Sequence, residues 1–511
     1  MSATQFEPFS AAVVDFQPSW QSLHETQSRG SQATAKPGED AQTQCLSWAD
    51  ASTEPRAQLS VDDDQPAAIP DLAIPELVDF LRRAEPLVIA AIEENNATED
   101  LFDDLARLGL DDPEANSAQM QHVLSHAPAL ALELQALCVA WNCSGTSIAV
   151  AYGHSTHENW CEHAGSVCVW HVERRQLDCE RAAVVLDSPA CVTALLWHPA
   201  RPSCLVRGSA TGSLAVYDLS LPEASGYLLA GCQSGHTESV TGLSWLGPDA
   251  LLSVALDGGV LVWDVPDRGS QLQLRQAFGV LASHIPSSLR DSRSTASNKQ
   301  IAITGCCVPP RQAIGPLFAV GTQAGVVFQC SLASQEVLPG GGHLGELPTH
   351  SPVQLALLAH QGPVFGLCCS PFEPRLVVSC GADGSVRLSS LLVSEPVVTL
   401  QPGQGYLYDV ACSPARPLLV AAGAETGQLL VWDLARDTSG PPSFSIAPEH
   451  PPPAILSVAF CSARPQLLAS ADAGGLVRIW DLGEAFASQM PGEEQQLQRM
   501  VGQAVANKSN S

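Results

Sequence analysis

Lysine is almost absent from this chain of 511 residues: it occurs only as Lys36, Lys299 and Lys508. Lysine and arginine together number 25, against 53 acidic residues, which gives a formal charge of −28. Proteins that bind nucleic acid or anionic membranes use basic side chains to displace the counterions of the phosphates. We therefore expect neither kind of partner. The acidity is concentrated in residues 1–130, which hold 23 acidic and 6 basic side chains.

Long apolar runs are also missing, since no segment approaches the roughly 20 residues that a membrane-spanning helix requires. The first residues lack the basic and apolar stretches of a secretory signal peptide. Cysteine is plentiful, but its number, 17, is odd and its spacing forms no disulfide framework. Most cysteines lie in apolar segments, where a thiol behaves as a small hydrophobic group. We expect a soluble intracellular chain with reduced thiols.

Signatures of catalysis are equally scarce. The sequence has no phosphate-binding glycine loop with its lysine, no nucleophile elbow and no zinc-protease motif. One short segment gathers possible metal ligands, namely His154, His157, Cys161 and His163. Their spacing matches no familiar zinc module. We therefore predict no catalytic residue, no cofactor and no metal, and we expect a protein that is not an enzyme.

The most prominent feature of the sequence is a short motif that is repeated seven times between Leu137 and Asp481. Small residues of a turn lead into an alternating apolar strand that ends at or near an aromatic residue and an aspartate. A period of about forty-odd residues with this signature is typical of WD-type blades. We predict an all-β fold, a seven-bladed WD-repeat β-propeller. The signature residues are Trp170, Tyr217, Trp263, Asp264, Trp432, Asp433, Trp480 and Asp481. Two further copies of the motif lack the Trp and have Gln329 and Ser389 at that position.

Two insertions, Val265–Gln300 and Val337–Leu355, lengthen the repeat and are predicted to be surface loops. Two blades offer the histidine–aspartate pair that braces many WD repeats. These pairs are His236 with Asp257 and His360 with Asp383.

Composition divides the chain into four segments. Residues 1–68 are rich in Ser, Gln, Ala, Asp and Pro and are predicted to be a disordered acidic region. Residues 69–126 are predicted to form short amphipathic helices, residues 127–485 the propeller, and residues 486–511 a polar tail. The tail makes a poor strand, so the last blade lacks its outer strand. We expect Ala127–Gln135 to supply that strand and close the ring, which removes exposed strand edges.

Two kinds of partner-binding segment precede the propeller. The first has the pattern of an extended peptide that adds as a strand to the sheet edge of a partner, although Thr-Gln pairs are also common in such polar regions. The second repeats apolar residues at helical spacing, and it either folds on the propeller or docks into a groove of a small partner. The candidate strand residues are Thr26, Gln27, Ala41, Gln42, Thr43, Gln44 and Cys45, and the candidate helix residues are Leu77, Leu81, Val88 and Ile92.

The helical segment and the first blade together resemble the WD-repeat intermediate chains of cytoplasmic dynein two, the motor of retrograde intraflagellar transport. The resemblance covers roughly residues 70–485 and is closest to the shorter of that motor's two intermediate chains. It rests on Ile74–Ile89, Ala140–Gly153, Gly165–Trp170, Gly405–Val420 and the last blade.

That resemblance implies a non-catalytic motor subunit, located in the cytoplasm, the cilium and the basal body. The propeller would bind the dynein heavy chain, and a second intermediate chain would be present in the complex. The hub-type light chain would bind the Thr-Gln segments, above all Ala41–Cys45, and the roadblock-type light chain the helix residues. Family motifs usually read Thr-Gln-Thr or Val-Gln-Thr, and here Cys45 stands in place of the final Thr.

Three alternatives remain. A substrate receptor or scaffold of a ubiquitin ligase would often carry Trp-Asp-x-Arg, but the fourth residue here is Pro266, Ala435 or Gly483. A metal protein would use the segment from His154 to His163. An axonemal or transport dynein intermediate chain is the third, against which the short acidic N-terminus argues.

Overall fold

The computed structural model describes Glu85, Ile89 and residues 118–509, apart from gaps at 156–160, 162, 174–176, 223–225, 234, 267–270, 287–298, 310–315, 339–342, 345–346, 358–359, 437–440 and 447–451. The chain divides into two compact units, Met1–Pro113 and Glu114–Ser511. In the first unit Glu85 and Ile89 are helical and exposed. The Thr-Gln segments and the candidate helix residues lie outside the described residues.

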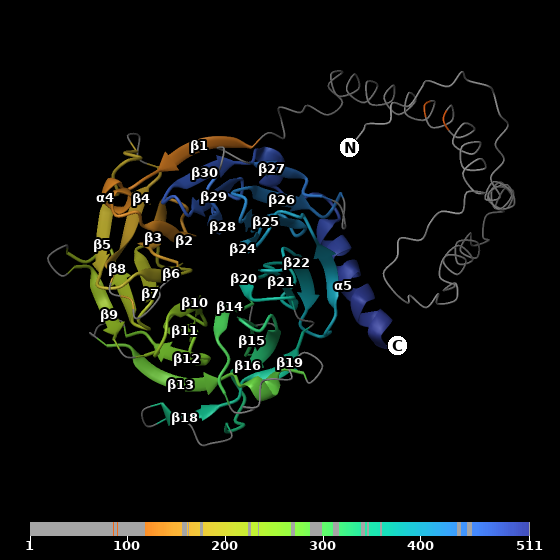
Figure 1. Ribbon diagram of the computed structural model, residues 1–511, viewed down its shortest axis with the longest axis horizontal. Coiled ribbons are helices and arrows are strands. Elements are labelled where there is room, and N and C mark those ends of the chain that lie inside the picture. Colours follow the sequence, from red (N-terminus) through yellow and green to blue (C-terminus); the bar gives the residue numbers. More distant parts are fainter. Residues whose placement is uncertain are drawn as a thin grey trace, which may run out of the picture. The chain divides into compact units, whose positions relative to one another are not determined.

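The second unit is a propeller of seven antiparallel sheets arranged in a ring (Figure 1), which confirms the predicted fold. Blades 1 to 3 comprise β2 (Gln135–Trp141), β3 (Ser147–Gly153), β4 (Gly165–His171) and β5 (Val184–Ser188); β6 (Val192–Trp197), β7 (Cys204–Ser209), β8 (Leu214–Asp218) and β9 (Leu228–Cys232); and β10 (Val240–Trp245), β11 (Ala250–Ala255), β12 (Gly259–Asp264) and β13 (Gln273–Gly279).

Blades 4 to 6 comprise β14 (Ile303–Cys307), β15 (Leu317–Thr322), β16 (Val327–Ser331) and β19 (Val353–Ala356); β20 (Val364–Cys369), β21 (Leu376–Gly381), β22 (Val386–Ser390) and β23 (Pro396–Leu400); and β24 (Leu407–Cys412), β25 (Leu419–Ala424), β26 (Leu429–Asp433) and β27 (Phe444–Ile446). Blade 7 joins β28 (Ile455–Phe460), β29 (Leu467–Asp472) and β30 (Val477–Asp481) to β1 (Gln119–Leu124).

The middle strands of the blades are buried on both faces because each blade packs between two neighbours. Every residue of β3 and of β7 is buried, which explains why β3 is a nearly continuous apolar run instead of an alternating one. In β7 the polar side chains of Arg207 and Ser209 are buried as well. Between blades 1 and 2, for example, Val167 and Leu186 pack against Leu205 and Tyr217. The hydrophobic core is therefore a series of layers between adjacent blades.

Glycine in the repeated turn has a steric cause. Gly258 and Gly475 have φ angles of 79° and 83°, a left-handed conformation that residues with a Cβ rarely adopt. A Cβ at Gly475 would also lie 2.7 Å from the carbonyl oxygen of Leu134. The small residues that mark each repeat in the sequence are thus required by the turn.

The ring is closed by β1, which pairs antiparallel with β30 from Gln119 opposite Asp481 to Leu124 opposite Val477. Closure by a segment before the first blade was predicted, but the predicted position, Ala127–Gln135, was wrong. Residues Ala127–Ala131 form the short helix α4, with Pro128 in its first turn, where the missing N–H of proline costs no hydrogen bond.

The closing strand also lies within the segment predicted to be helical, so the propeller begins before residue 127. The strand β1 reads Gln-Met-Gln-His-Val-Leu, and only Leu124 is fully buried. An outer strand of this kind has one face in solvent and little apolar alternation, which is why the sequence pattern did not reveal it.

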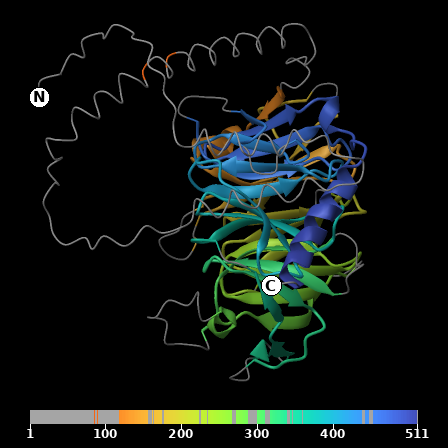
Figure 2. The same cartoon turned by 90° about the vertical axis from the view of Figure 1, so that its right-hand side faces the viewer.

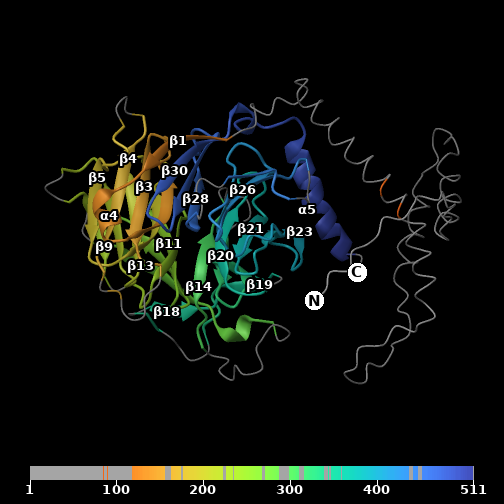
Figure 3. The same ribbon diagram turned by 45° about the horizontal axis from the view of Figure 1, so that its top comes forward.

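The predicted polar tail contains a helix, α5 (Glu493–Ser509), preceded by the short helical turn η6 (Glu484–Phe486). The side chains of Leu497 and Val501 are buried against blades 5 and 6, in contact with the cluster that contains Trp432. Figures 2 and 3 show α5 lying across the outside of these blades. The C-terminal segment is therefore part of the folded propeller unit.

The two insertions are more ordered than predicted. The second forms a hairpin of β17 (His343–Leu344) and β18 (Leu347–His350), and β18 pairs parallel to β13 at the edge of blade 3. The first contains β13 itself and the short helix η3 (Ala282–His284), while most of its serine-rich part lies outside the described residues. Within the described part of the chain, no helix has the length and apolar character needed to cross a membrane.

Removing residues 1–125 deletes β1 and is expected to destabilise the whole propeller. The change exposes the edge of β30 and the partners of Leu124, and we expect the free energy of unfolding to fall by at least about 3 kcal/mol. Urea unfolding followed by tryptophan fluorescence measures it. Removal of residues 1–113 alone is the control and should leave the midpoint unchanged; equal midpoints for both truncated chains would contradict closure by β1.

Candidate functional site

The signature aromatic residues lie in the third strand of their blades, and all five side chains are buried between blades. The indole N–H of Trp263 donates to Ser253 Oγ at 2.8 Å, and that of Trp480 donates to Ser470 Oγ at 2.9 Å. These aromatic side chains hold the strands of each blade together. Because they are buried, their role is structural.

The signature acids have three different environments. Asp264 is exposed on β12, with Arg275 3.7 Å away. Asp481 accepts a hydrogen bond at 2.7 Å from Gln121, across the ladder that closes the ring. Asp433 is buried and binds both of its carboxylate oxygens to Arg416. Asp481 therefore stabilises the attachment of β1 to the ring, and Asp433, through Arg416, stabilises the attachment of the C-terminal segment.

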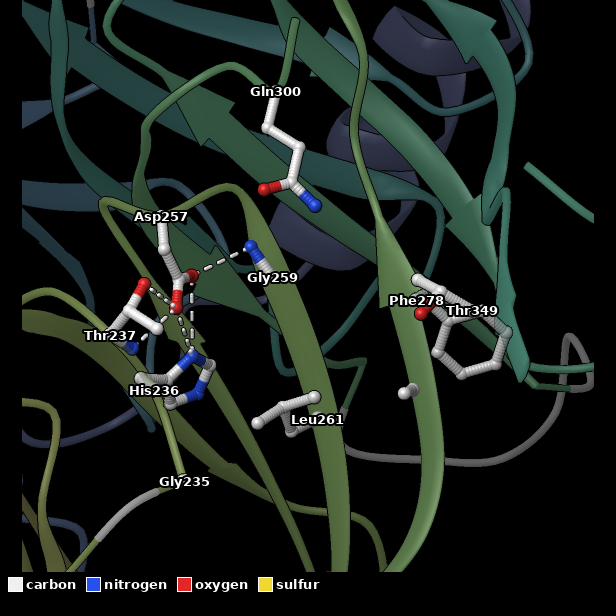
Figure 4. Close-up of a pocket in the computed structure, with 10 residues that line it drawn as sticks. Gly235, His236, Thr237, Asp257, Gly259, Leu261, Phe278, Gln300 and Thr349 are labelled. Carbon is white, nitrogen blue, oxygen red and sulfur yellow. Dashed lines mark hydrogen bonds and ion pairs between the residues drawn. The ribbon is translucent and has the colours of Figure 1, made fainter. Parts of the chain in front are cut away.

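The predicted brace of blade 3 is present and is drawn in Figure 4. Nδ1 of His236 lies 3.2 Å from Asp257 Oδ2, and its Nε2 lies 2.8 Å from Ser253 Oγ. Asp257 also accepts hydrogen bonds from the backbone N–H of Thr237 and of Gly259. Burial raises the pKa of Asp257, but these hydrogen bonds outweigh it and leave the pKa below its ordinary value.

The brace of blade 5 is also as predicted. Nδ1 of His360 lies 3.0 Å from Asp383, and its Nε2 lies 2.8 Å from Ser379 Oγ. Burial lowers the pKa of His360. Although burial raises the pKa of Asp383, hydrogen bonds from His360 and Ser385 bring it down to about 2. Both nitrogens of each histidine and both oxygens of each aspartate have partners, so these pairs are structural networks.

A small cavity of about 110 Å³ lies beside the blade 3 brace. Figure 4 shows His236 and Asp257 on one side of it and Phe278, Gln300 and Thr349 on the other. Ligand pockets usually have volumes of about 300–1,000 Å³. This cavity has room for a few water molecules, and no arrangement of an acid, a base and a substrate site is found among its lining residues.

A larger groove of about 1340 Å³ runs over blades 1 to 3 and is lined by Asp187, Arg207, Tyr217, Leu228 and Gln271, among others. Nε of Arg207 donates to Tyr217 Oη at 2.9 Å, while its buried Nη1 has no hydrogen-bond partner within the described protein atoms. A guanidinium in this position can bind a carboxylate or a carbonyl oxygen of another molecule.

The contact between α5 and blade 6 is a buried ion network that the sequence did not reveal. Arg416, on the connection between β24 and β25, is 1% exposed. Its Nη2 lies 3.0 Å and 3.1 Å from the two carboxylate oxygens of Asp433, and its Nε lies 2.9 Å from Glu493 of α5. The ring of Phe486 lies 5.7 Å from the guanidinium carbon. One arginine thus fixes the C-terminal helix to the ring.

A second network joins the blades on either side of the closure. The carboxylate of Asp409, on β24, accepts hydrogen bonds from the N–H of Val458 at 2.9 Å and from Ser457 Oγ at 3.0 Å, both on β28. Ser457 Oγ in turn accepts a hydrogen bond from Val139 N–H, on β2, at 3.3 Å. Burial raises the pKa of Asp409 to about 6. The network therefore links blades 6, 7 and 1 and contains a group that titrates near neutral pH.

Other sequence candidates are only partly described. Cys161 and His163 lie on the connection between β3 and β4, together with His154, whereas His157 lies outside the described residues. Cys191, which sequence spacing did not suggest, lies beside them. All 16 cysteines from Cys138 onward are free thiols.

Replacing Arg416 by alanine is expected to destabilise the protein strongly. The change leaves the carboxylate of Glu493 buried without a cation and that of Asp433 with only the exposed Arg436, and loss of one partner of a buried ion pair typically costs about 3–5 kcal/mol. Arg436→Ala is a matched control, because the Arg436 side chain also lies within 3.6 Å of Asp433 but is 63% exposed. Chemical unfolding should show a change below about 0.5 kcal/mol for the control. A similar small change for Arg416→Ala would contradict the role of the network.

Replacing Asp409 by asparagine should alter the dependence of stability on pH. The pKa of Asp409 in the folded chain, about 6, lies above its ordinary value of 3.8. Its contribution to stability is therefore fully present below the ordinary value and is lost as the pH rises through about 6. Relative to the native chain, Asp409→Asn should gain stability between pH 5 and pH 7.5.

Thermal unfolding of both chains across this range measures the effect, and the other titrating groups cancel in the difference. Asp409→Ala is the control. It also loses the acceptor for Val458 N–H and should therefore be less stable than Asp409→Asn at every pH. A constant difference between the native chain and Asp409→Asn would show that Asp409 does not titrate in this range.

Comparison with known proteins agrees with this architecture. The family model described as "WD domain, G-beta repeat" matches residues 226–264, 351–388 and 444–481, which end on the third strands of blades 3, 5 and 7. The chain is 25% identical over 354 residues to "Dynein axonemal intermediate chain 4" of Rattus norvegicus, covering 65% of this chain and 40% of that protein.

Two relatives are matched over more of their length. "Cytoplasmic dynein 2 intermediate chain 2" of Mus musculus is 31% identical over 471 residues, which is 89% of this chain and 85% of the relative. The protein of the same name from Homo sapiens is 30% identical over 388 residues, or 72% and 69% of the two chains. These matches confirm the resemblance found from the sequence: the chain belongs to the family of WD-repeat intermediate chains of cytoplasmic dynein 2.

Proposed function

We propose that this protein is a non-catalytic intermediate chain of a cytoplasmic dynein 2 motor. Its propeller binds the heavy chain, its N-terminal region carries light chains, and the complex acts in retrograde intraflagellar transport and cilium assembly. The observation that carries the proposal is the 31% identity that extends over 89% of the chain. A match over 89% of the chain is longer than the propeller unit, Glu114–Ser511, so it includes part of the segment before it.

A scaffold function fits the chemistry of the propeller. The histidines and aspartates of blades 3 and 5 hold strands together through both of their polar ends, so they are not available as a general acid or base. The cavity beside the first of these pairs is about 110 Å³. A subunit that binds other subunits needs a rigid surface, and the ring supplies it.

The connection between the two units fits a load-bearing role. The chain leaves the N-terminal region and enters β1, whose residues pair with β30 along the ladder from Gln119 to Leu124. A pull on the N-terminal region is therefore transmitted to a strand that is hydrogen-bonded into the ring, so light chains held there are attached to the propeller through a sheet.

We place the hub-type light chain at Ala41–Cys45, with Thr26–Gln27 as a second site, and the roadblock-type light chain at Leu77, Leu81, Val88 and Ile92. Strand addition requires an extended segment with alternating side chains, and helix docking requires an apolar stripe. Two weak sites bind firmly when dimeric light chains connect two intermediate chains, because the second contact is then intramolecular. We accordingly propose a second intermediate chain in the complex, and a location in the cytoplasm, cilium and basal body.

Affinity purification of the tagged chain from ciliated cells, followed by mass spectrometry, tests the proposal. We expect a dynein heavy chain and light chains with the full chain. Removal of residues 1–70 should lose the hub-type light chain and retain the heavy chain, because the propeller is intact. The double change Thr43→Ala and Gln44→Ala should reduce the recovered amount of the hub-type light chain at least about tenfold. The double change Thr26→Ala and Gln27→Ala, at the second site, is the matched comparison.

Recovery of a ubiquitin-ligase adaptor without any motor subunit would contradict the proposal and favour the substrate-receptor alternative. Loss of the heavy chain on removal of residues 1–70 would contradict the assignment of heavy-chain binding to the propeller.

A further inference from the structure

Three possible metal ligands meet where blade 1 adjoins blade 2. Cys161 and His163 lie on the connection from β3 to β4, and Cys191 immediately precedes β6. Their ligand atoms all lie within 4.8 Å of one another. The topology brings them together, because β5 ends at Ser188 opposite Gly165, the first residue of β4. The connection from β5 to β6 therefore lies beside the connection from β3 to β4.

Two glycines permit this close approach. A Cβ at Gly153 would lie 2.7 Å from the Cβ of Cys191, and a Cβ at Gly165 would lie 2.8 Å from its Cα. Real Cβ atoms do not approach other carbon atoms so closely, so larger residues would push Cys191 away from blade 1. The strand ends are thus shaped to hold Cys191 against the connection that carries the other ligands.

Both sulfur atoms are shielded from solvent, and as thiols they lie 3.7 Å and 3.8 Å from the carbonyl oxygen of His163. Cys191 is fully buried, and Cys161 is 8% exposed. The N–H of His154 donates to Cys191 Sγ at 3.2 Å, and the N–H of Cys191 donates to Cys161 Sγ at 3.4 Å. Backbone donors of this kind stabilise a thiolate that binds a metal.

His154 is the available fourth ligand. Its ring lies 4.7 Å from the ring of His163, in an edge-to-face arrangement, and it follows Gly153 at the end of β3. Zinc binds sulfur at about 2.3 Å and histidine nitrogen at about 2.0–2.1 Å, so tetrahedral ligands lie roughly 3.3–3.8 Å apart. Movements of about 1 Å would bring the ligand atoms of Cys161, His163 and Cys191 to these distances, whereas the side chain of His154, which lies outside that group, has to turn toward them.

We propose that Cys161, Cys191, His154 and His163 form a structural zinc site that joins blade 1 to blade 2. Binding releases the two thiol protons to solvent, and two thiolates with two neutral imidazoles give an uncharged centre. With four protein ligands the metal has no open position for a substrate, so the site stabilises the fold. The prediction of no metal rested on the spacing of one segment, which contains only three of these ligands. The proposal is independent of the motor assignment.

Metal analysis of the purified full chain is the first test. The site predicts about one zinc ion per chain, retained through dialysis, and its loss in Cys161→Ser and Cys191→Ser. Cys143→Ser is the matched control, because Cys143 lies at the opposite end of the same blade, between β2 and β3, and should retain the zinc.

The spectrum of Co²⁺ bound to the native chain tests the site without any substitution, so it does not depend on how well a variant folds. Adding Co²⁺ to the metal-free native chain should produce the thiolate charge-transfer band and the intense visible bands of a tetrahedral site, and His154→Ala should weaken the visible bands. Zinc should also raise the thermal midpoint of the metal-free native chain and of Cys143→Ser, but not that of Cys191→Ser. A chain that retains no zinc and gives no such spectrum, a spectrum unchanged by Cys191→Ser, or a disulfide between Cys161 and Cys191 would overturn the proposal.

Discussion

The pairing of β1 with β30 is the constraint on which the rest of this structure depends. Each blade buries its two faces only against its neighbours, so an open ring would expose one face of blade 1 and one face of blade 7. The strand that closes the ring comes from before the first blade and the strand that receives it comes from the last. The hydrogen bond from Val139 N–H to Ser457 Oγ crosses the same boundary on the inner strands, and the bond from Ser457 to Asp409 continues the network to blade 6. Closure therefore makes the seven sheets one cooperative unit.

The features that recur from blade to blade could be predicted from the sequence, whereas most features that occur only once in the structure could not. The turn glycines and the apolar third strands recur from blade to blade, because the strands of each blade pack between two neighbours in the same way. The pairs His236–Asp257 and His360–Asp383 repeat one arrangement in blades 3 and 5. The closing strand is polar and occurs once, so its pairing with β30 left no periodic signal. Arg416 and Glu493 are separated by 77 residues, and Cys191 reaches the ligands of blade 1 only through the propeller topology. Contacts of this kind follow from the three-dimensional arrangement.

Both ends of the propeller unit are fixed to the ring, which bears on how the protein acts within a motor. The N-terminal side enters through β1, and the C-terminal side ends in α5, fixed by Arg416 to blade 6. Under the function proposed above, the chain connects other subunits, and the attachment of its two ends then limits the strength of that connection. The buried polar groups of the ring therefore have a mechanical interpretation: they stabilise the boundaries between blades and the two chain ends.

Hydrogen–deuterium exchange of the native chain tests closure most directly, because it measures the stability of each strand without altering the sequence. If β1 is an integral strand of blade 7, the paired amides of Gln119–Leu124 should exchange as slowly as those of β29, near the rate set by global unfolding. Fast exchange of β1 with full protection of β28 and β29 would show that the ring remains folded without its closing strand, and would contradict the account.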